Sequence, residues 1–341
     1  MGRNISASVR ALHDGGVLPA MRRIEPAGDF FPYYVIPDDS DKACDADRRC
    51  QDLVRLVAQP EAQPYDRKGL LLIASSSLNI GAVEQGAAMT DYCAFAKRVA
   101  AWLNWEGPVF VVNTACTSGL NALLAAKAVL EKDEVPEALV LGIELENRLT
   151  QGGFLGLQLL SPDAAQPFGA ARNGLVLGES VSAIHLSRKP SSWRLLGGAN
   201  VLAGDQPTGA SASAVTRMCQ EALKDSGLQP EHIDLIKVQA AGSVSNDLAE
   251  AQGLLGAFSD VPALLSLKSY LGHTMGASGV SEAVLLMGCL NEGVWPTVDY
   301  PQDPTLGVAL AQKAPRRLQH VMVNILGFGG SHASVVLARC A

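Results

Sequence analysis

Residues 107–130, GPVFVVNTACTSGLNALLAAKAVL, pass from an apolar run through small polar residues into a helical pattern. The run PVFVVN at 108–113 predicts a buried strand, because its apolar residues do not alternate with polar ones. The helical part carries apolar side chains on one face: Leu120, Leu123, Leu124 and Ala128. A strand followed by a tight turn and a returning helix indicates an α/β fold with a parallel or mixed sheet.

The same strand–turn–helix unit recurs later in the chain. Apolar runs of strand length appear in both halves, at 69–77, 137–144, 232–239 and 262–268. A helical pattern follows at 279–293, and the chain closes with two strand-like runs hinged by Gly327, Gly329 and Gly330. We therefore expect two related halves, 1–190 and 191–341, whose sheets stack about shared helices.

Composition excludes several classes of protein. The 341 residues are 48% hydrophobic and 18% charged, with a net charge of −7, which is globular and argues against a general nucleic-acid binder. Seven cysteines without a CxxC pair argue against a disulfide framework or structural zinc, and six unclustered histidines suggest no metal. No apolar run approaches the roughly 20 residues of a membrane span, so a cytoplasmic protein is expected. The acidic stretch at 36–50 predicts a surface loop.

Cys116 lies where the apolar run breaks and the helical pattern begins. At the mouth of a helix, backbone N–H groups and the helix dipole would lower the pKa of a thiol and favour the thiolate. The small residues on either side leave room for a substrate to approach. A buried structural cysteine is an equally good interpretation of the spacing alone.

Two later stretches supply groups that could act with this thiol. In SLKSYLGHTMGASG (266–279), His273 could polarise a carbonyl and Lys268 could hold negative charge in the same cavity, although a loop histidine with a satisfied hydrogen bond is an alternative. In ILGFGGSHAS, glycines let the backbone approach a substrate, so the N–H groups of Cys116 and Phe328 could together bind an oxyanion. His185 is interpreted as a strand histidine, and His332 as a neighbour of this loop.

Taken together, these motifs resemble the β-ketoacyl-acyl carrier protein synthases, condensing enzymes with the thiolase fold. The stretches that carry the resemblance occur in family order: NTACTSG, PFGAARNGLVLGES, NDLAEAQ, KSYLGHTMGASG and LGFGGSHAS. The resemblance implies a thiolase-like α/β fold, with two related halves of mixed five-stranded sheets layered with helices as αβαβα. It also implies a dimer that pairs through strands near the nucleophile.

The resemblance assigns roles to individual residues. Cys116 accepts the acyl group, Lys268 and His273 form the lysine-plus-histidine motif, and Glu250 supports the lysine. Phe328 gates the acyl pocket and lends its N–H to the oxyanion hole. Further substrate-binding residues implied by these motifs are Thr117, Thr274 and Gly329.

The chain departs from the family pattern at the second catalytic histidine. Counting forward from Asp234 and back from Asp247 places Gln239 at the position of that histidine, and Ala240 and Ala241 replace the Gly-Thr that follows it. Two other departures concern the start, where the family's glycine-rich first strand is not recognised, and the stretch 77–107, which is shorter than usual.

Gln239 is expected to affect the two stages of the family reaction differently. A glutamine amide can donate a hydrogen bond but has no titratable proton, so acyl transfer to Cys116 should survive, whereas decarboxylative condensation with a malonyl thioester should be slowed or lost. The expected function is a 3-oxoacyl synthase-type acyltransferase of fatty acid or polyketide biosynthesis. The alternative is a non-elongating or chain-length-determining subunit beside a complete ketosynthase, and a purely structural role is a third.

The resemblance also implies the partners. An acyl carrier protein would deliver the substrate on its phosphopantetheine arm, so no separate cofactor is expected. The chain would form a homodimer, or a heterodimer with a related ketosynthase chain.

Overall fold

Two β-sheets with related strand orders form the framework of the computed structural model, which describes residues 2–25, 27–37, 45–58, 66–203 and 208–340. The first sheet has the order β4-β3-β5-β7 and the second has the order β10-β9-β11-β12-β8. The first contains Val109–Val112 (β4), Leu70–Ala74 (β3), Glu137–Glu144 (β5) and Ser180–Ser187 (β7). The second contains Ala263–Leu265 (β10), Leu235–Lys237 (β9), His320–Leu326 (β11), Ser331–Arg339 (β12) and Trp193–Leu202 (β8).

The pairing pattern shows the duplication directly. In the first sheet β3 pairs in parallel with β4 and β5, and β7 is antiparallel to β5. In the second, β9 pairs in parallel with β10 and β11, and β12 is antiparallel to β11. Strand β8 extends the second sheet beyond β12 and has no counterpart among the described strands of the first. The expected five strands are therefore present in the second sheet, and the described residues form four strands in the first.

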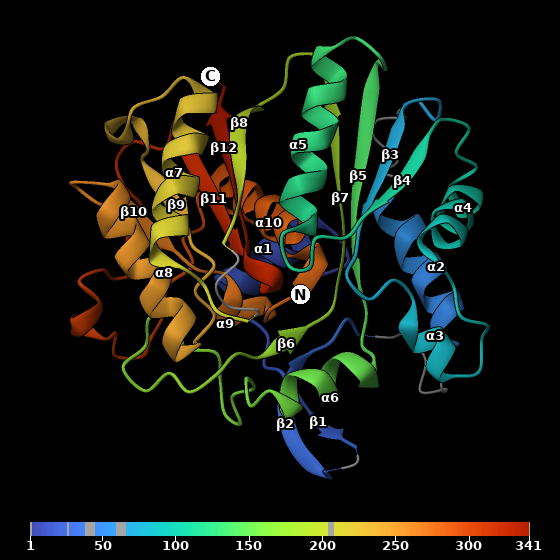
Figure 1. Cartoon of the computed structure of the whole chain (residues 1–341), viewed down its shortest axis with the longest axis horizontal. Helices are drawn as coiled ribbons and strands as arrows, with labels where there is room; N and C mark the ends of the chain where they lie inside the picture. The colour runs from blue at the N-terminus through green and yellow to red at the C-terminus, as the bar shows by residue number, and fades with distance from the viewer. Residues whose placement is uncertain (1, 26, 38–44, 59–65, 204–207, 341) are drawn as a thin grey trace.

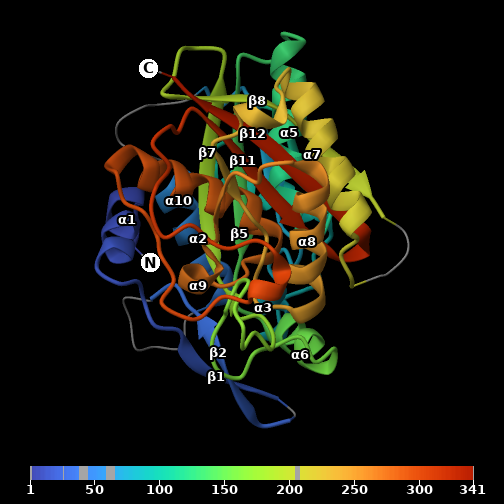
Figure 2. The ribbon, with the colours of Figure 1, turned by 90° about the vertical axis from the view of Figure 1, so that its left-hand side faces the viewer.

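Helices lie between and outside the sheets in five layers, as Figure 1 shows. The central layer contains Ser118–Glu131 (α5) and Ser278–Glu292 (α10), whose side chains share one core with both sheets, and Ile5–His13 (α1) packs on α10. Ala46–Ala58 (α2) and Tyr92–Leu103 (α4) cover the outer face of the first sheet. Ala212–Ser226 (α7) and Val244–Ala257 (α8) cover the outer face of the second. Figure 2 views the molecule from the left-hand side of Figure 1, along the direction in which the layers are stacked.

The sequence correctly predicts the main strands, and two details differ. Ala128 of α5 is exposed, because the helix packs between two sheets and turns Ala122 and Ala126 inward instead. Of the stretch 36–50, residues 38–44 lie outside the described ranges, and Ala46 already begins α2 rather than a surface loop. The reason is an apolar stripe of Cys50, Val54 and Ala58 at four-residue spacing, which packs on the sheet.

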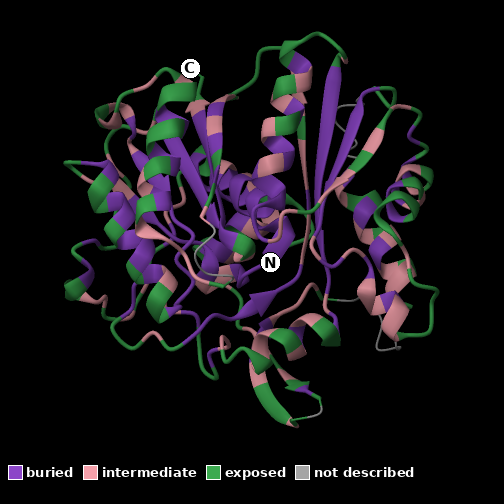
Figure 3. Cartoon of the chain, in the orientation of Figure 1, coloured by how far each residue is buried: buried purple, intermediate pink, exposed green. Residues whose placement is uncertain are grey.

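Below the layers, a small sheet closes one end of the molecule. Ala20–Ile24 (β1) and Asp29–Tyr34 (β2) form a hairpin, and β2 pairs with Leu177–Gly178 (β6). Arg148–Gly156 (α6) lies beside it. Figure 3 shows that buried residues concentrate in the two sheets and the central helices, whereas this end is largely exposed or intermediate. In the part of the chain that the structure describes, no helix has both the length and the apolar character needed to cross a membrane.

The two central helices cross at glycines. A methyl group at Gly279 would lie 2.5 Å from the backbone nitrogen of Leu120, and one at Gly119 would lie 2.7 Å from that of Val280. Such distances are shorter than any van der Waals contact, so only glycine allows α5 and α10 to approach this closely. Because Cys116 and His273 lie just before these two helices, the crossing also brings the two side chains together.

Candidate active site

Cys116 lies on the sharp turn between β4 and α5. The residue before it, Ala115, has a φ of +53°, a conformation that is uncommon for a residue other than glycine. The hydroxyl of Ser118 holds the turn, since it donates to the carbonyl of Ala115 and accepts from the N–H of Thr114. The turn directs the sulfur of Cys116 into a cavity, where the residue is only 5% exposed.

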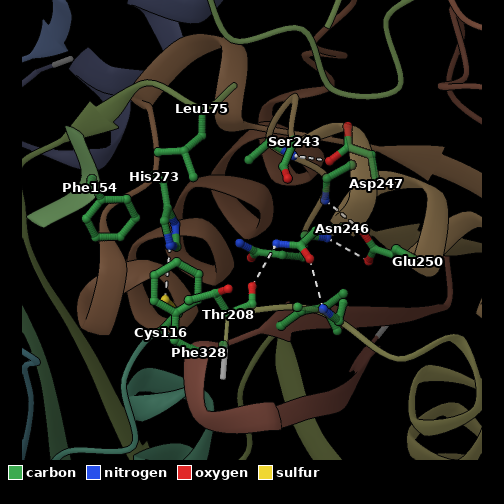
Figure 4. A pocket seen from close by; sticks show the side chains of 17 residues that line it. Cys116, Phe154, Leu175, Thr208, Ser243, Asn246, Asp247, Glu250, His273 and Phe328 are labelled. Carbon is green, nitrogen blue, oxygen red and sulfur yellow. Dashed lines mark hydrogen bonds between the residues drawn. The ribbon is translucent and has the colours of Figure 1, made fainter. Parts of the chain in front are cut away.

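The cavity brings together side chains from both halves of the chain. Cys116 and Phe154 come from the first half, and Gln239, His273 and Phe328 from the second (Figure 4). The rings of Phe154 and Phe328 stack at 5.3 Å between centroids. The free space is about 30 Å³, which is room for about two water molecules.

His273 faces the sulfur of Cys116. Its Nε2 lies 3.1 Å from the Cys116 Sγ, and Figure 4 shows the ring directed at the sulfur. Backbone hydrogen bonds fix the residue: its N–H donates to the carbonyl of Val176, and its carbonyl accepts from Gly178. Gly272, with a φ of +70°, makes the turn in front of it, where a methyl group would lie 2.7 Å from the Leu177 carbonyl oxygen. The backbone thus sets the direction of the imidazole.

Lys268 determines which nitrogen of His273 carries the proton. Its Nζ lies 3.0 Å from the His273 Nδ1 and forms a buried ion pair with Glu282. An ammonium group can only donate, so Nδ1 accepts and the proton resides on Nε2. The imidazole therefore presents an N–H to Cys116 and to the cavity.

Burial controls the acidity of both groups. It raises the pKa of the Cys116 thiol to about 11, against the lowering effects of the Phe328 N–H and the charge of Lys268. The sequence predicts a lowered thiol pKa, and the net direction of that prediction is wrong. Cys116 lies in the turn, two residues before α5 begins at Ser118, and desolvation raises the pKa more than the backbone N–H donors lower it. Burial and the charges of Lys268 and Lys237 hold the pKa of His273 well below its usual range, so the imidazole is neutral.

Glu250 does not contact Lys268. Its carboxylate accepts from the backbone N–H groups of Gln239 and Ala240, at 2.8 and 2.6 Å. Glu282, on α10, takes the role that the resemblance gave to Glu250, because α10 runs beside Lys268 whereas α8 lies under the turn that follows β9. Glu282 is the one charged residue in the stretch 279–290, and that is the sequence signal that could have identified it.

Gln239 occupies the cavity wall at the end of β9, with 8% of its surface exposed. The turn that carries it is fixed from below by Glu250, and further along by Asp247, which accepts from the N–H groups of Ala241 and Gly242. The amide oxygen of Gln239 is buried and has no hydrogen-bond partner among the described residues. A buried unpaired acceptor is costly, which marks this oxygen as a place for a donor on a ligand.

Of the other residues predicted to bind substrate, one lines the cavity and three lie outside its wall. Phe328 lines the cavity, and its N–H and that of Cys116 both lie close enough to the sulfur to lower the pKa of the thiol. The hydroxyl of Thr117 is buried against Ser331, and that of Thr274 against Ser281, so both stabilise the fold beneath the site. Gly329 is exposed at a φ of +75°, outside the cavity wall, and it shapes the loop that presents Phe328.

The remaining histidines lie outside the cavity wall. His185, on β7, contacts Glu137 at 3.0 Å, as expected of a strand histidine. His332 is fully buried on β12 and accepts from the Ser211 N–H. Within the described ranges, no three His, Cys, Asp or Glu side chains gather as a metal-binding group.

Comparison with known proteins supplies the family. Residues 71–191 match the N-terminal domain of β-ketoacyl synthases and residues 198–299 match the C-terminal domain. The chain belongs to the β-ketoacyl synthase family, and its fold is thiolase-like.

Individual relatives show the range of that family. A 3-oxoacyl-[acyl-carrier-protein] synthase 2 from Coxiella burnetii is 26% identical over 69% of this chain and 62% of its own length. A ketosynthase in complex with its chain length factor from Xenorhabdus doucetiae has a TM-score of 0.83 at 23% identity, covering 99% of this chain and 95% of its own. A type II polyketide synthase complex, AntDE:AntF, in which an acyl-carrier protein is bound to its ketosynthase, has a TM-score of 0.84 at 20% identity, covering 99% and 96%. The matched part spans about three fifths of the length of the curated relatives.

Proposed function

We propose that this chain accepts an acyl group from a carrier-protein thioester on Cys116. The supporting observation is the arrangement of the Cys116 sulfur, 3.1 Å from the protonated Nε2 of His273 and facing the N–H of Phe328, in a cavity formed by both halves. In the transfer, the sulfur attacks the thioester carbonyl and the bond to the carrier's pantetheine sulfur breaks. The proton of the Cys116 thiol ends on that leaving sulfur. The N–H groups of Cys116 and Phe328 stabilise the oxyanion in between.

Condensation makes a different demand on the site. Loss of CO2 from a malonyl thioester leaves an enolate oxygen, which needs donors from the wall opposite the sulfur. His273 supplies one N–H, and Gln239 can supply a second only if its amide nitrogen faces the oxygen rather than its unpaired Oε1. Loss of one such donor costs about 3–4 kcal/mol, a factor of about 10²–10³ in rate. We therefore propose that acyl transfer is efficient and carbon–carbon bond formation is slow.

The second candidate is a non-elongating or chain-length-determining subunit in a ketosynthase heterodimer. Gln239 favours it, since the site has one imidazole where the family pattern has two. The likeness in fold to a chain of a ketosynthase complex with its chain length factor supports this candidate. The intact contacts among Cys116, His273 and Lys268 favour acyl acceptance, because a purely structural subunit has no need of them.

The partners and the compartment follow from the proposal. The substrate would arrive on the pantetheine arm of an acyl carrier protein, and no other cofactor is required. The chain would act as a dimer, with itself or with a related ketosynthase chain. The six described cysteines are free, which suits the reducing cytoplasm.

One experiment separates these functions. The protein is incubated with an acyl-carrier thioester, and the mass of the Cys116 peptide is measured; malonyl carrier protein is then added, and CO2 and lengthened product are measured. We expect acyl mass on Cys116, none in Cys116→Ala, and little CO2. Acylation with rapid CO2 release would establish a complete condensing enzyme. No acylation, alone or with a ketosynthase partner, would overturn the proposal.

Replacement of Gln239 by histidine tests the cause of the slow step. We expect Gln239→His to raise CO2 release and product formation by about 10²-fold, because a second imidazole donor then faces the enolate oxygen. Acylation of Cys116 should change little. Gln239→Leu is the matched control: it should keep acylation and abolish the residual CO2 release. Equal condensation in the two variants would show that this position does not contact the enolate.

A further inference from the structure

A second lysine is buried behind the site. Lys237, the last residue of β9, is 0% exposed, and its Nζ lies 2.7 Å from Glu282 Oε2 and 2.8 Å from the carbonyl oxygen of Asn324. The other carboxylate oxygen of Glu282 binds Lys268, which also binds His273. The contacts therefore form one line from Lys237 through Glu282, Lys268 and His273 to the sulfur of Cys116.

The charges in this line do not cancel. When both lysines are protonated, Lys237 and Lys268 carry two positive charges and Glu282 carries one negative charge, a net charge of +1 with all three side chains fully buried. Burial lowers the pKa of Lys237, whereas the carboxylates of Glu282 and Glu250 raise it. Both lysines hold the pKa of Glu282 below its usual range, so the carboxylate stays ionised. A single lysine on this carboxylate would already give a neutral pair. The second lysine therefore adds a positive charge to a low-dielectric interior, where a charge is costly unless it is paired, and its further acidic neighbour is Glu250.

We propose that Lys237 is a positioning residue of the acyl-transfer site: as a second cation on Glu282, it keeps Lys268 directed at His273 and holds the imidazole as a neutral Nε2–H donor. Because Glu282 divides its charge between two ammonium groups, it cannot neutralise Lys268 alone. Lys268 keeps a free donor for Nδ1 of His273, at 3.0 Å. The imidazole then cannot gain a second proton and must present Nε2–H to the sulfur and the cavity.

The same positive charge favours negative charge on the far side of the imidazole. A cation stabilises an anion nearby, so it assists formation of the Cys116 thiolate and of an oxyanion in the cavity. This part of the inference rests on the proposed function in one respect, because the proposed acyl transfer identifies the oxyanion as that of the thioester carbonyl. Gln239, two residues after Lys237, is uncharged. Lys237 is therefore the residue through which this segment of the chain adds positive charge near the site.

Other charged groups also act on this line. Glu250, on α8, faces Lys237 from the other side of β9, and burial raises its pKa to about 7. Glu144, at the end of β5, opposes ionisation of the Cys116 thiol. Asp247 lies beside Glu250, and burial raises its pKa to about 6. All three residues remain in the variants below. Because the charge of Lys237 lowers the pKa of Glu250, Lys237→Met raises that pKa in the single and the double variant alike.

The test uses two variants of the full chain that differ in net charge. Lys237→Met leaves the neutral pair of Lys268 and Glu282, whereas Lys237→Met with Glu282→Gln restores a net charge of +1 through Lys268 alone. The rate of Cys116 alkylation by iodoacetamide is measured by peptide mass between pH 7 and pH 9. Long-range ¹H–¹⁵N spectra of histidine-labelled protein report the tautomer of His273. Neither readout requires an acyl donor, so failure of this inference is distinguishable from failure of the proposed function.

We expect alkylation to be about tenfold slower at each pH in Lys237→Met and to return toward the wild-type rate in the double variant. Lys127→Met, which removes an ion pair with Glu131 on the surface of α5, should leave the rate unchanged. An unchanged rate in Lys237→Met, or an equal loss in the single and double variants, would overturn the proposal, since a packing defect is not repaired by removing Glu282. If Lys237→Met does not fold, the wild-type spectra decide: an Nε2–H imidazole at pH 6–8 supports the proposal, and an Nδ1–H or doubly protonated ring contradicts it.

Discussion

Burial and hydrogen bonding act on the thiol of Cys116 in opposite directions, and burial dominates. With a pKa of about 11, about one thiol in ten thousand is ionised at pH 7. Because the anion is the reactive form, alkylation and acylation of Cys116 should accelerate about tenfold per pH unit between pH 7 and pH 10. Measurement of Cys116 alkylation by peptide mass over this range tests the expected slope.

Cys93 provides the internal reference for this profile. It is exposed near the start of α4, and it is alkylated in the same samples, so it reports the reagent and the digestion. A plateau in the Cys116 rate below pH 8 would contradict the prediction. It would mean that the helix mouth and the Phe328 N–H outweigh desolvation, as the sequence pattern alone suggested.

The sequence locates the site residues whose contacts are local and fails where the contact is long-range. Cys116, His273 and Lys268 stand in short motifs in which a turn or a glycine fixes the backbone, so the sequence predicts that their side chains lie in one site, and the structure brings them together. The partner of Lys268 is Glu282, fourteen residues away on α10, and the contact of the Lys268 side chain with α10 distinguishes this glutamate from Glu250. The burial that raises the thiol pKa is likewise a property of the closed cavity, not of the motif.

At the level of elements, the crossing of α5 and α10 connects the fold to the chemistry. The added methyl group of Gly279→Ala would press on the backbone of Leu120, and overpacking of this kind costs about 1–3 kcal/mol of unfolding free energy. The helices should separate, which lengthens the distance between Cys116 and His273 and slows acylation. Chemical denaturation and the acylation assay measure the two effects.

Gly153→Ala is the control for that substitution. Gly153 lies in α6, is exposed, and has no atom within 4 Å of the position of an added methyl group. The change should be neutral or stabilise by about 0.4–1 kcal/mol, with unchanged acylation, because alanine only restricts the unfolded chain there. If Gly279→Ala behaves in the same way, the helix crossing does not limit the site.

A helix or strand can be predicted from the sequence where its hydrophobic pattern results from a single burial environment. The uninterrupted apolar runs of β3 and β5 exist because both faces of the first sheet are covered, so the sequence identifies these strands. The face of α5 is harder to assign, since sheets on two sides bury Ala122 and Ala126 as well as the leucines. Acidic residues before and within the first turn of α2 make its start look like a surface loop. The apolar stripe of the helix is recognised only once the sheet on which it packs is known.

At the scale of the whole molecule, each of the two sheets has an edge strand with a large exposed apolar side chain. The first ends in β4, where Phe110 is 57% exposed and lies opposite Leu72 of β3. The second ends in β8, where Leu202 is 69% exposed. Large exposed apolar side chains on an edge strand indicate an interaction surface. The family resemblance assigns pairing to the strand near the nucleophile, which is β4.

We expect the chain to dimerise through β4, and Phe110→Lys to dissociate the dimer. An isologous interface contains Phe110 twice, and loss of a buried aromatic anchor costs about 2 kcal/mol for each copy, with added repulsion between the two lysines. Sedimentation velocity should then show the wild type as a dimer and Phe110→Lys at the 35.8 kDa of one chain. Leu202→Lys, which introduces the same charge on the edge of the other sheet, should leave the dimer intact. Dissociation by Leu202→Lys and not by Phe110→Lys would place the interface on β8, on the edge of the second sheet.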